Sequence, residues 1–358
     1  MQQSVQSLVR EIYQQEGYVY ARSPEEIAQT YGFDRVARLA SNENPFGPSP
    51  RAVVAVQEAI AGMHRYPDTT TSMLTDALRT YHGGYEYVYV TGVGMDGVIE
   101  TCIRALVNPG DSVAVAVPTF SFYGLAAKAQ SAHVIPVPRR DDFSVDVDAF
   151  IRAAKGSKIS FLCSPNNPTG TMTPVDDIAI IAESIDGILF LDNAYVEFSD
   201  LDYRNLMASH ENLVIGRTMS KIFGLAGCRI GYALVPAWLR PIYEKAATPF
   251  TVNILSAAAA AGALIDQEYV NRSRNHARAW IQRFYDECHL PVLPSGANFV
   301  MIDTAPMTGD ECSAALAERG VIVRSCRSFP GLDNHYIRVC VGEDWECEKF
   351  IKELNTLC

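Results

Sequence analysis

The sequence lacks the features that mark membrane, secreted and metal-binding proteins. Its longest run of small apolar residues, 254–265, is mostly alanine and too short to span a bilayer, so we expect a buried helix there. The polar N-terminal stretch MQQSVQSLVREIYQQEG has no apolar signal core and is helix-like. The nine cysteines include no C-x-x-C pair, and the seven histidines include no H-E-x-x-H motif. We therefore expect reduced, buried thiols in a cytoplasmic protein without a metal site.

Positive charge is also scarce. The chain carries 30 Lys and Arg against 41 Asp and Glu, a net charge of −11 at pH 7. A field of that sign repels nucleic acids and anionic lipids, so neither a nucleic acid nor a membrane is expected as a partner. Apolar residues make up 48% and charged residues 20% of the 358 residues. This composition excludes a disordered chain, a collagen and a coiled coil, and the length predicts about two globular domains.

Strand-like and helix-like segments alternate through the middle of the chain. Several strand-like segments are continuous apolar runs, such as VAVAV, ISFLC and ILFLD, as expected of strands covered by helices on both faces. The expected strands are 87–90, 112–117, 133–137, 158–163, 188–192, 212–216 and 229–235. The alternation predicts an α/β fold with a mainly parallel seven-stranded sheet flanked by helices. Ligands bind such sheets beyond the carboxyl ends of the strands.

The pattern changes after residue 263. Apolar side chains recur at helical spacing and predict one long amphipathic helix over 264–289. Two short expected strands, 299–302 and 336–341, with helices between and after them, indicate a smaller α+β domain. The expected organisation is an N-terminal arm (1–38), a large domain (39–262) and a small C-terminal domain (263–358).

A glycine-rich turn, GVGMDG at 92–97, follows one expected strand and precedes a helix expected at 97–107. Its spacing matches the first half of the dinucleotide fingerprint, which also requires an acid near the end of the next strand. That strand ends in Pro118 and Thr119, and Asp111 lies at its other end, so a nicotinamide enzyme is disfavoured. The glycines allow backbone N–H groups at the start of a helix to approach a phosphate, although they equally suit a plain tight turn.

Four polar segments lie where such a sheet places its site. Three follow expected strands and the fourth lies eight residues beyond Lys221: SPNNPTG at 164–170, DNAY at 192–195, TMSK at 218–221, and Arg229. Each alone has a plain structural explanation, since Asn-Pro-Thr-Gly is a common turn and a single lysine is usually a solvated surface charge. Their order and spacing together indicate a functional site.

With these segments, the chain resembles the fold type I pyridoxal-phosphate aminotransferases, and within them the histidinol-phosphate aminotransferase family. The resemblance runs from about Tyr18 to the C-terminus. The motifs that carry it are LASNENPFGPSP, HRYPD, GVGMDG, PTFSFY, SPNNPTG, DNAY, TMSKIFGLAGCRIGY and YIRVCVG. It implies an aspartate-aminotransferase-like fold, pyridoxal 5'-phosphate as cofactor, and a homodimer with shared active sites.

The resemblance also implies roles for residues around the cofactor ring. Lys221 would be the catalytic residue, which forms the Schiff base with the cofactor aldehyde and then carries a proton between the substrate and cofactor carbons. Asp192 would keep the pyridine nitrogen protonated, so that the ring acts as an electron sink. Asn167 and Tyr195 would hydrogen-bond the phenolic oxygen. Phe120, where the family usually has Tyr, would stack on the ring.

The cofactor phosphate would be held by a second group of residues in the resembling family. They are Gly94, Met95, Asp96, Thr218, Ser220 and Arg229, together with Tyr66 of the partner subunit. Arg229 would also help to lower the pKa of Lys221. The chain departs from the family pattern at Met95, where Ser or Ala is usual, at Gly97, where Glu is common, and at Asn193, which replaces Glu. Met95 can still donate through its backbone.

Substrate contacts are expected from the small domain and the N-terminal segments. Arg324 and Arg338 lie in apolar runs, which favours a buried anion site over a surface position, and in the resembling family they bind the phosphate of the substrate. Tyr18 resembles the tyrosine that closes on the same group. Asn44 is expected near the substrate, with a turn role before Pro45 as the alternative.

The activity implied by the resemblance is amino transfer between histidinol phosphate and 2-oxoglutarate or glutamate, by a ping-pong Schiff-base mechanism in histidine biosynthesis. An aromatic amino acid aminotransferase and a threonine-phosphate decarboxylase on the same fold remain alternatives. The decarboxylase shares the lysine, the aspartate and the two arginines, whereas the NENP loop favours the aminotransferase. A binding protein without turnover is disfavoured, because Lys221 and Asp192 are both present.

Overall fold

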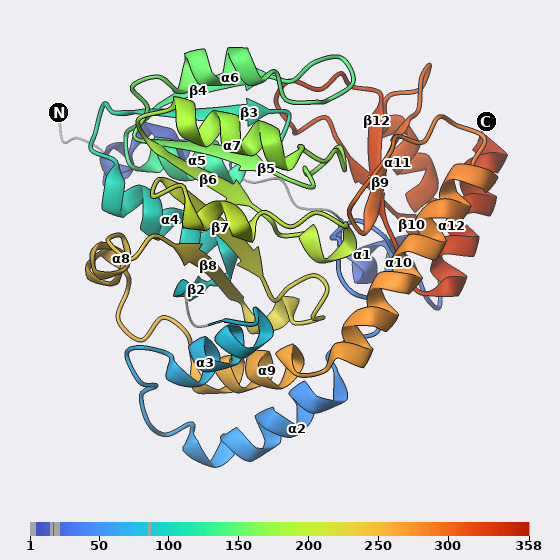
Figure 1. Ribbon diagram of the computed structural model, residues 1–358. Helices are drawn as coiled ribbons and strands as arrows, with labels where there is room; N and C mark the ends of the chain where they lie inside the picture. Colours follow the sequence, from blue (N-terminus) through green and yellow to red (C-terminus); the bar gives the residue numbers. More distant parts are fainter. Residues whose placement is uncertain (1–4, 15–16, 18–21, 85–86, 358) are drawn as a thin grey trace.

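A seven-stranded sheet forms the centre of the larger part of the molecule, in the order β2-β8-β7-β6-β5-β3-β4 (Figure 1). The computed structural model describes residues 5–14, 17, 22–84 and 87–357. The strands are β2 (Val88–Val93), β3 (Ser112–Val117), β4 (His133–Pro138), β5 (Ile159–Cys163), β6 (Ile188–Asp192), β7 (Leu213–Thr218) and β8 (Ile230–Val235). Strand β8 is antiparallel to β2 and β7, and the other neighbours are parallel. The predicted fold class is confirmed.

Both faces of the sheet are covered by helices. In β3, Val113 and Val115 belong to one hydrophobic cluster, whereas Ala114 and Ala116 belong to the cluster on the opposite face. The first face carries α4 (Gly94–Leu106), α5 (Phe122–Ala129) and α8 (Arg240–Ala246). The second carries α3 (Ser72–Tyr81), α6 (Val147–Ala154), α7 (Val175–Ser184) and α9 (Ile254–Leu264), with α2 (Pro50–Ala59) packed against α9 (Figure 1). Burial on both faces explains the unbroken apolar runs of these strands.

A smaller layer lies beside the carboxyl ends of the parallel strands (Figure 1). Its antiparallel sheet has the order β11-β12-β9, and a separate pair joins β1 to β10 in parallel. The strands are β1 (Ala37–Arg38), β9 (Phe299–Asp303), β10 (Val321–Ile322), β11 (Arg324–Ser325) and β12 (Tyr336–Cys340), and the helices are α1 (Pro24–Tyr31), α10 (Gln267–Glu287), α11 (Gly309–Ala317) and α12 (Asp344–Leu357). The expected long helix is therefore present as α10, and α9 ends before it begins.

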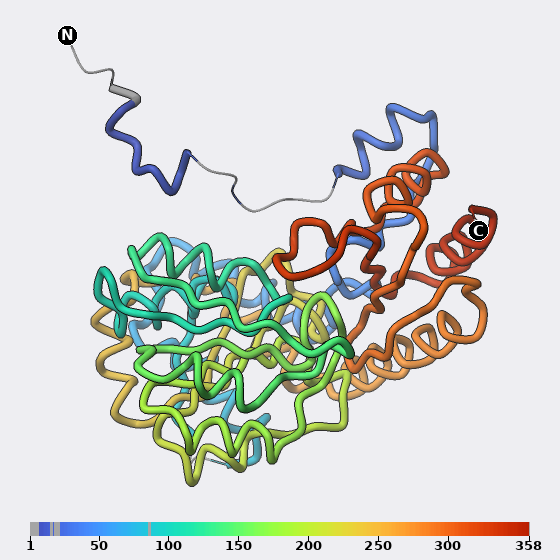
Figure 2. Tube along the Cα trace, turned by 90° about the horizontal axis from the view of Figure 1, so that it is seen from above, coloured from blue at the N-terminus to red at the C-terminus, as the bar shows by residue number. Residues whose placement is uncertain are grey.

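The predicted arm (1–38) consists of two structurally different parts. The described residues before 18 form two 3-10 turns, η1 (Val5–Leu8) and η2 (Glu11–Gln14), and not the expected helix. Arg10 bonds from there to the Ala129 carbonyl oxygen at 2.8 Å, so this stretch contacts the large domain through a side chain, although its Cα trace runs outside the body of the chain in Figure 2. Helix α1, in contrast, buries Ile27 in the small layer, against Ile322 and its neighbours. Further 3-10 turns are η3 (Ile60–Gly62), η4 (Val196–Phe198), η5 (Arg204–Ala208) and η6 (Ala226–Cys228).

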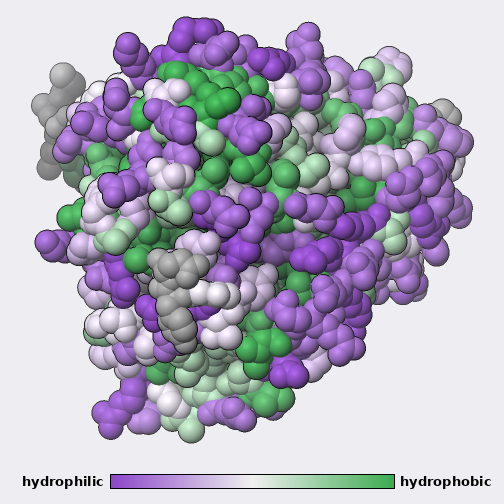
Figure 3. Space-filling model, in the orientation of Figure 1, coloured by the Kyte–Doolittle hydropathy of each residue, from purple (hydrophilic) through white to green (hydrophobic). Residues whose placement is uncertain are grey.

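The surface shown in Figure 3 is mainly hydrophilic, with smaller hydrophobic areas between the polar side chains. Among the helices of the described residues, none combines the length and the apolar character that a membrane crossing requires. Eight cysteines lie in the described ranges, and all eight are free thiols.

Candidate active site

A cavity of about 300 Å³ lies where the carboxyl ends of β5, β6 and β7 face β11 and β12. The sheet places one polar side chain after another there, because the parallel strands end at the same edge. Asp192 ends β6, Thr218 ends β7, and Lys221 follows three residues later. Twelve of the predicted site residues line the cavity: Met95, Asp96, Phe120, Asn167, Asp192, Tyr195, Thr218, Ser220, Lys221, Arg229, Arg324 and Arg338.

Lys221 has the properties of an amine nucleophile. Its Nζ donates to the Ser41 carbonyl oxygen at 3.1 Å and lies 5.7 Å from the centroid of the Tyr195 ring. Burial lowers the pKa of Lys221 to about 8, with a further contribution from the positive charge of Arg338 and a smaller one from Arg229. The sequence pointed to Arg229 for this effect, whereas desolvation and Arg338 contribute more. About a tenth of the amine is therefore neutral at pH 7, far more than for an ordinary lysine.

Asp192 is a buried carboxylate, only 3% exposed. Its Oδ2 accepts a hydrogen bond from the Tyr123 hydroxyl at 2.6 Å, and its Oδ1 accepts one from the Ala194 backbone N–H at 2.9 Å. Burial raises the pKa of Asp192 to about 6, although the Tyr123 hydrogen bond opposes the shift. A cation placed against this carboxylate in the cavity would favour its charged form.

Tyr123 is a residue that sequence reasoning missed. It is fully buried and stacks on Phe161, with ring centroids 4.9 Å apart and an interplanar angle of 6°. It lies in the PTFSFY motif, three positions after Phe120; Phe120 precedes α5, Tyr123 lies in its first turn, and both line the cavity. The motif was available in the sequence, but the partner of the hydroxyl was not.

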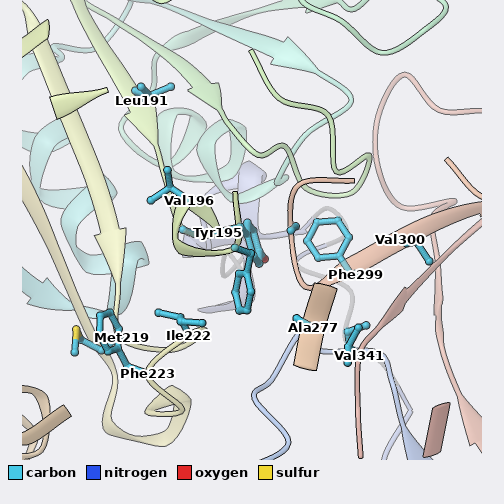
Figure 4. Packing of buried hydrophobic residues seen from close by; sticks show 14 of the residues in the cluster. Leu191, Tyr195, Val196, Met219, Ile222, Phe223, Ala277, Phe299, Val300 and Val341 are labelled. Carbon is cyan, nitrogen blue, oxygen red and sulfur yellow. The ribbon is translucent and has the colours of Figure 1, made fainter. Parts of the chain in front are cut away.

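Two further side chains are held in place by loop residues. The Tyr195 hydroxyl accepts a hydrogen bond from Asn42 Nδ2 at 3.0 Å, and Asn167 Oδ1 accepts one from Arg338 Nη1 at 2.5 Å. The Tyr195 ring meets Phe299 edge-on, with centroids 5.0 Å apart, across the junction of the two sheets (Figure 4). With its oxygen engaged by Arg338, the Asn167 side chain can offer its amide nitrogen to a ligand.

The start of α4 forms a cradle for an anion. Gly94 has φ +67°, and a Cβ at this position would lie 2.5 Å from Arg229 Nη2. The Gly94 N–H donates to the Arg229 carbonyl oxygen at 2.8 Å, but no side chain caps the first turn of α4, so the backbone N–H groups that follow Gly94 can serve a ligand. The hydroxyls of Thr218 and Ser220 lie 3.0 Å apart beside it. Arg229 pairs with Asp96 at 2.7 Å.

This donor set fits pyridoxal phosphate. The cavity offers an amine of lowered pKa to the aldehyde, a buried carboxylate to the ring nitrogen, hydrogen-bonding groups to the phenolic oxygen and an aromatic side chain, Phe120, to the ring face. The helix start, two hydroxyls and a guanidinium provide the charge-assisted donors that a phosphate requires. The Met95 side chain is buried, so this residue can offer the phosphate only its backbone N–H.

Two arginines converge on the opposite wall of the cavity. Arg324 of β11 and Arg338 of β12 are directly opposed in the antiparallel register, so their side chains lie on the same face. Both are more than nine-tenths buried. Arg324 donates to Ser328 Oγ at 3.0 Å, and Arg338 donates to the Ala40 carbonyl oxygen at 2.5 Å. Arg338 Nε is buried without a hydrogen-bond partner, which points to an anionic ligand at this wall.

Two of the predicted contacts are not brought to this cavity. The Asn44 amide nitrogen donates to the Ile222 carbonyl oxygen at 2.9 Å and to Ser273 Oγ at 3.0 Å, and its oxygen accepts from the Phe46 backbone, so Asn44 has the turn role. Its neighbour Asn42 faces the cavity instead. Tyr66 is 80% exposed and stacks on Phe250, 4.6 Å away. Tyr18 lies outside the described residues.

Comparisons with known proteins agree with this geometry. Residues 34–354 match the family of class I and II aminotransferases. The histidinol-phosphate aminotransferase of Methanoculleus marisnigri is 60% identical over 95% of this chain and 96% of its own length, and that of Methanocorpusculum labreanum is 54% identical over 98% and 99%.

A solved structure extends the comparison to three dimensions. Histidinol-phosphate aminotransferase from Sinorhizobium meliloti, in complex with pyridoxal-5'-phosphate, superimposes with a TM-score of 0.87 at 25% identity, over 99% of this chain and 98% of that one. The chain therefore belongs to the class I and II aminotransferases, pyridoxal-phosphate enzymes, and within them to the histidinol-phosphate aminotransferase family.

Proposed function

We propose that this enzyme transfers an amino group between histidinol phosphate and 2-oxoglutarate or glutamate in histidine biosynthesis. The observation that carries the proposal is the buried pair Arg324 and Arg338 on the wall of the cavity that holds Lys221. The name shared by the relatives supports the same substrate. The free thiols of the described cysteines support a cytoplasmic site of action.

The chain supplies the groups that this reaction needs. Pyridoxal phosphate, when bound, provides the electron sink that stabilises a carbanion next to the amino group. Lys221 can take the proton from the substrate carbon and return it to the cofactor carbon, since its pKa is near 8 and its Nζ lies in the cavity. Asp192 would hold the ring nitrogen in its protonated form. Arg229 and the start of α4 would orient the cofactor through its phosphate.

A phosphate ester explains why two arginines are present. Near pH 7 it carries between one and two negative charges and has three strong acceptor oxygens. One bidentate arginine leaves part of that charge unpaired, and this is unfavourable once the closed site excludes water. Two guanidinium groups on the same face of the small sheet can share the charge of the ester, and Tyr18 is proposed to add a hydroxyl.

Removing one guanidinium is expected to change donor preference. Arg324→Ala should lower the specificity constant for histidinol phosphate by about ten- to a hundredfold, because one charge-assisted contact contributes about 1.5–3 kcal/mol. An unphosphorylated donor such as phenylalanine should lose much less. The measurement is a donor panel of histidinol phosphate, histidine, phenylalanine, tyrosine and threonine phosphate, run on wild type and variant. Equal losses for all donors would make Arg324 a structural residue and favour the aromatic aminotransferase.

We also propose a homodimer in which Tyr66 completes the neighbouring site. Its exposure in a single chain supports this assignment. Tyr66→Phe should weaken cofactor binding by about ten- to a hundredfold, through loss of one hydrogen bond to a charged phosphate.

Mixed dimers test the sharing of sites. Heterodimers of Tyr66→Phe and Lys221→Ala subunits should regain activity at limiting cofactor, because one site then receives Tyr66 from one parent and Lys221 from the other. No recovery beyond the two parents would show that each site is built within one chain.

A further inference from the structure

Glu43 is an acidic side chain of the cavity wall that the reaction described above does not use. Among the described residues that line the cavity, three are acidic: Glu43, Asp96 and Asp192. Asp96 is paired with Arg229 at 2.7 Å, and Asp192 accepts the Tyr123 hydroxyl at 2.6 Å and serves the ring nitrogen. Glu43 pairs with Arg38 at 3.8 Å, with 47% and 56% of the two side chains exposed. Such an exposed pair is weak, so the Glu43 carboxylate can turn to a ligand.

Each of the three residues before Glu43 makes a hydrogen bond to a residue that lines the cavity. Arg338 donates to the Ala40 carbonyl oxygen at 2.5 Å, and Lys221 donates to that of Ser41 at 3.1 Å. Asn42 donates through its side chain to Tyr195. The segment therefore runs past both the phosphate-binding arginine and the catalytic lysine, and it holds Glu43 at a set position relative to both.

The proposed substrate has three chemically distinct parts. Its amine-bearing carbon must lie at Lys221, and its phosphate must lie at the pair Arg324 and Arg338. Its third part is an imidazole ring, which always has an N–H donor and is close to its protonation midpoint near neutral pH. Asp96 and Asp192 are already engaged, by Arg229 and by the Tyr123 hydroxyl. The remaining charged groups that line the cavity are cations, which repel a protonated ring, whereas the Glu43 carboxylate can accept its N–H.

We propose that Glu43 accepts a hydrogen bond from the imidazole ring of histidinol phosphate and so selects this donor. The inference rests on the proposed function and deepens it, because it assigns a residue that binds the imidazole ring, the part of the substrate that the two arginines do not contact. Glutamate, the second substrate, has no such donor group on its side chain. Glu43 therefore favours the half-reaction with histidinol phosphate and makes no favourable contact in the half-reaction with glutamate.

The two half-reactions of Glu43→Gln test this assignment. Each is followed by the absorbance of the bound cofactor in single turnover, with histidinol phosphate or glutamate as donor. Glu43→Gln is expected to lower the specificity constant for histidinol phosphate about three- to tenfold, as for a partly exposed charge contact. The constant for glutamate is expected not to fall. Inhibition by inorganic phosphate, which probes the arginines, should stay the same.

A matched variant outside the cavity controls for the loss of one negative charge from the protein. Glu348→Gln breaks an ion pair of the same length, 3.8 Å to Arg283, on α12 and outside the cavity, and should leave both half-reactions unchanged. Parallel losses for both donors in Glu43→Gln, or no loss for either, would overturn the inference. Wild-type enzyme that fails to use histidinol phosphate would overturn the proposed function itself, a different outcome from either result with the variant.

Discussion

Replacing Lys221 by alanine is expected to lower kcat by at least about two to four orders of magnitude, the usual contribution of one positioned proton carrier. The variant loses both the amine that captures the cofactor and the base that moves the proton. Borohydride reduction of the cofactor-loaded protein should fix the cofactor to Lys221 in wild type, so that it survives denaturation. In Lys221→Ala the cofactor should be lost on denaturation.

Two controls separate chemistry from stability. Lys352→Ala removes an exposed lysine of α12 and should leave both kcat and the fixed label unchanged. Lys221→Arg keeps a positive charge but has no neutral amine near pH 8, so it should remain inactive. In wild type, the rate of cofactor capture should rise with pH through about 8, because the amine loses its proton there. A label on another lysine would contradict the assignment of the site.

Much of this site could be predicted because it follows from the ends of parallel strands. The strands 112–117 and 188–192 begin and end at the predicted residues, and Asp192 closes the second of them. Buried strands of this kind are unbroken apolar runs, so the first polar residue marks the edge of the sheet. The glycine turn was likewise visible, since Gly94 has a backbone conformation that disfavours other residues.

The parts of the fold and of the site that could not be predicted depend on contacts between segments that are distant in the sequence. β1, β10 and β11 have two residues each, too few for any periodicity, and their pairing is set by the small layer. The sequence offered Asn44 as a residue near the substrate, with a turn role as the alternative, and did not single out Asn42. Both are loop asparagines two positions apart, and only the tertiary contact with Tyr195 distinguishes them. The hydrogen bond from Tyr123 to Asp192 joins residues 69 positions apart, so no local pattern encodes it.

Asp192→Asn is expected to keep the cofactor but to lose about two to three orders of magnitude in kcat, as when a preorganised electrostatic group is removed from a transition state. Asparagine has the same shape and can still accept the Ala194 N–H and donate to the Tyr123 oxygen. It cannot hold a proton on the ring nitrogen, so the carbanion loses its electron sink. Cofactor titration and single-turnover kinetics separate binding from chemistry, and Asp192→Ala should show the same loss of rate. Near-normal turnover in either variant would remove the electron-sink argument.

The stability of the cofactor-free protein provides an independent measurement on the same variant. Burial raises the pKa of Asp192 from 3.8 to about 6, so between these pH values the folded protein binds more protons than the unfolded chain. The free energy of unfolding of wild type therefore falls as pH rises from about 4 to about 6, by an amount of about 3 kcal/mol for this group.

Asp192→Asn has no carboxyl group at this position, so its free energy of unfolding lacks this dependence on pH. It should melt above wild type at pH 7, and the difference should vanish below about pH 4, where the wild-type carboxyl is neutral in both states. If the variant melts below wild type at pH 7, the Asp192 carboxylate stabilises the fold. Its burial would then not be a destabilising feature of the cofactor-free protein that serves cofactor binding.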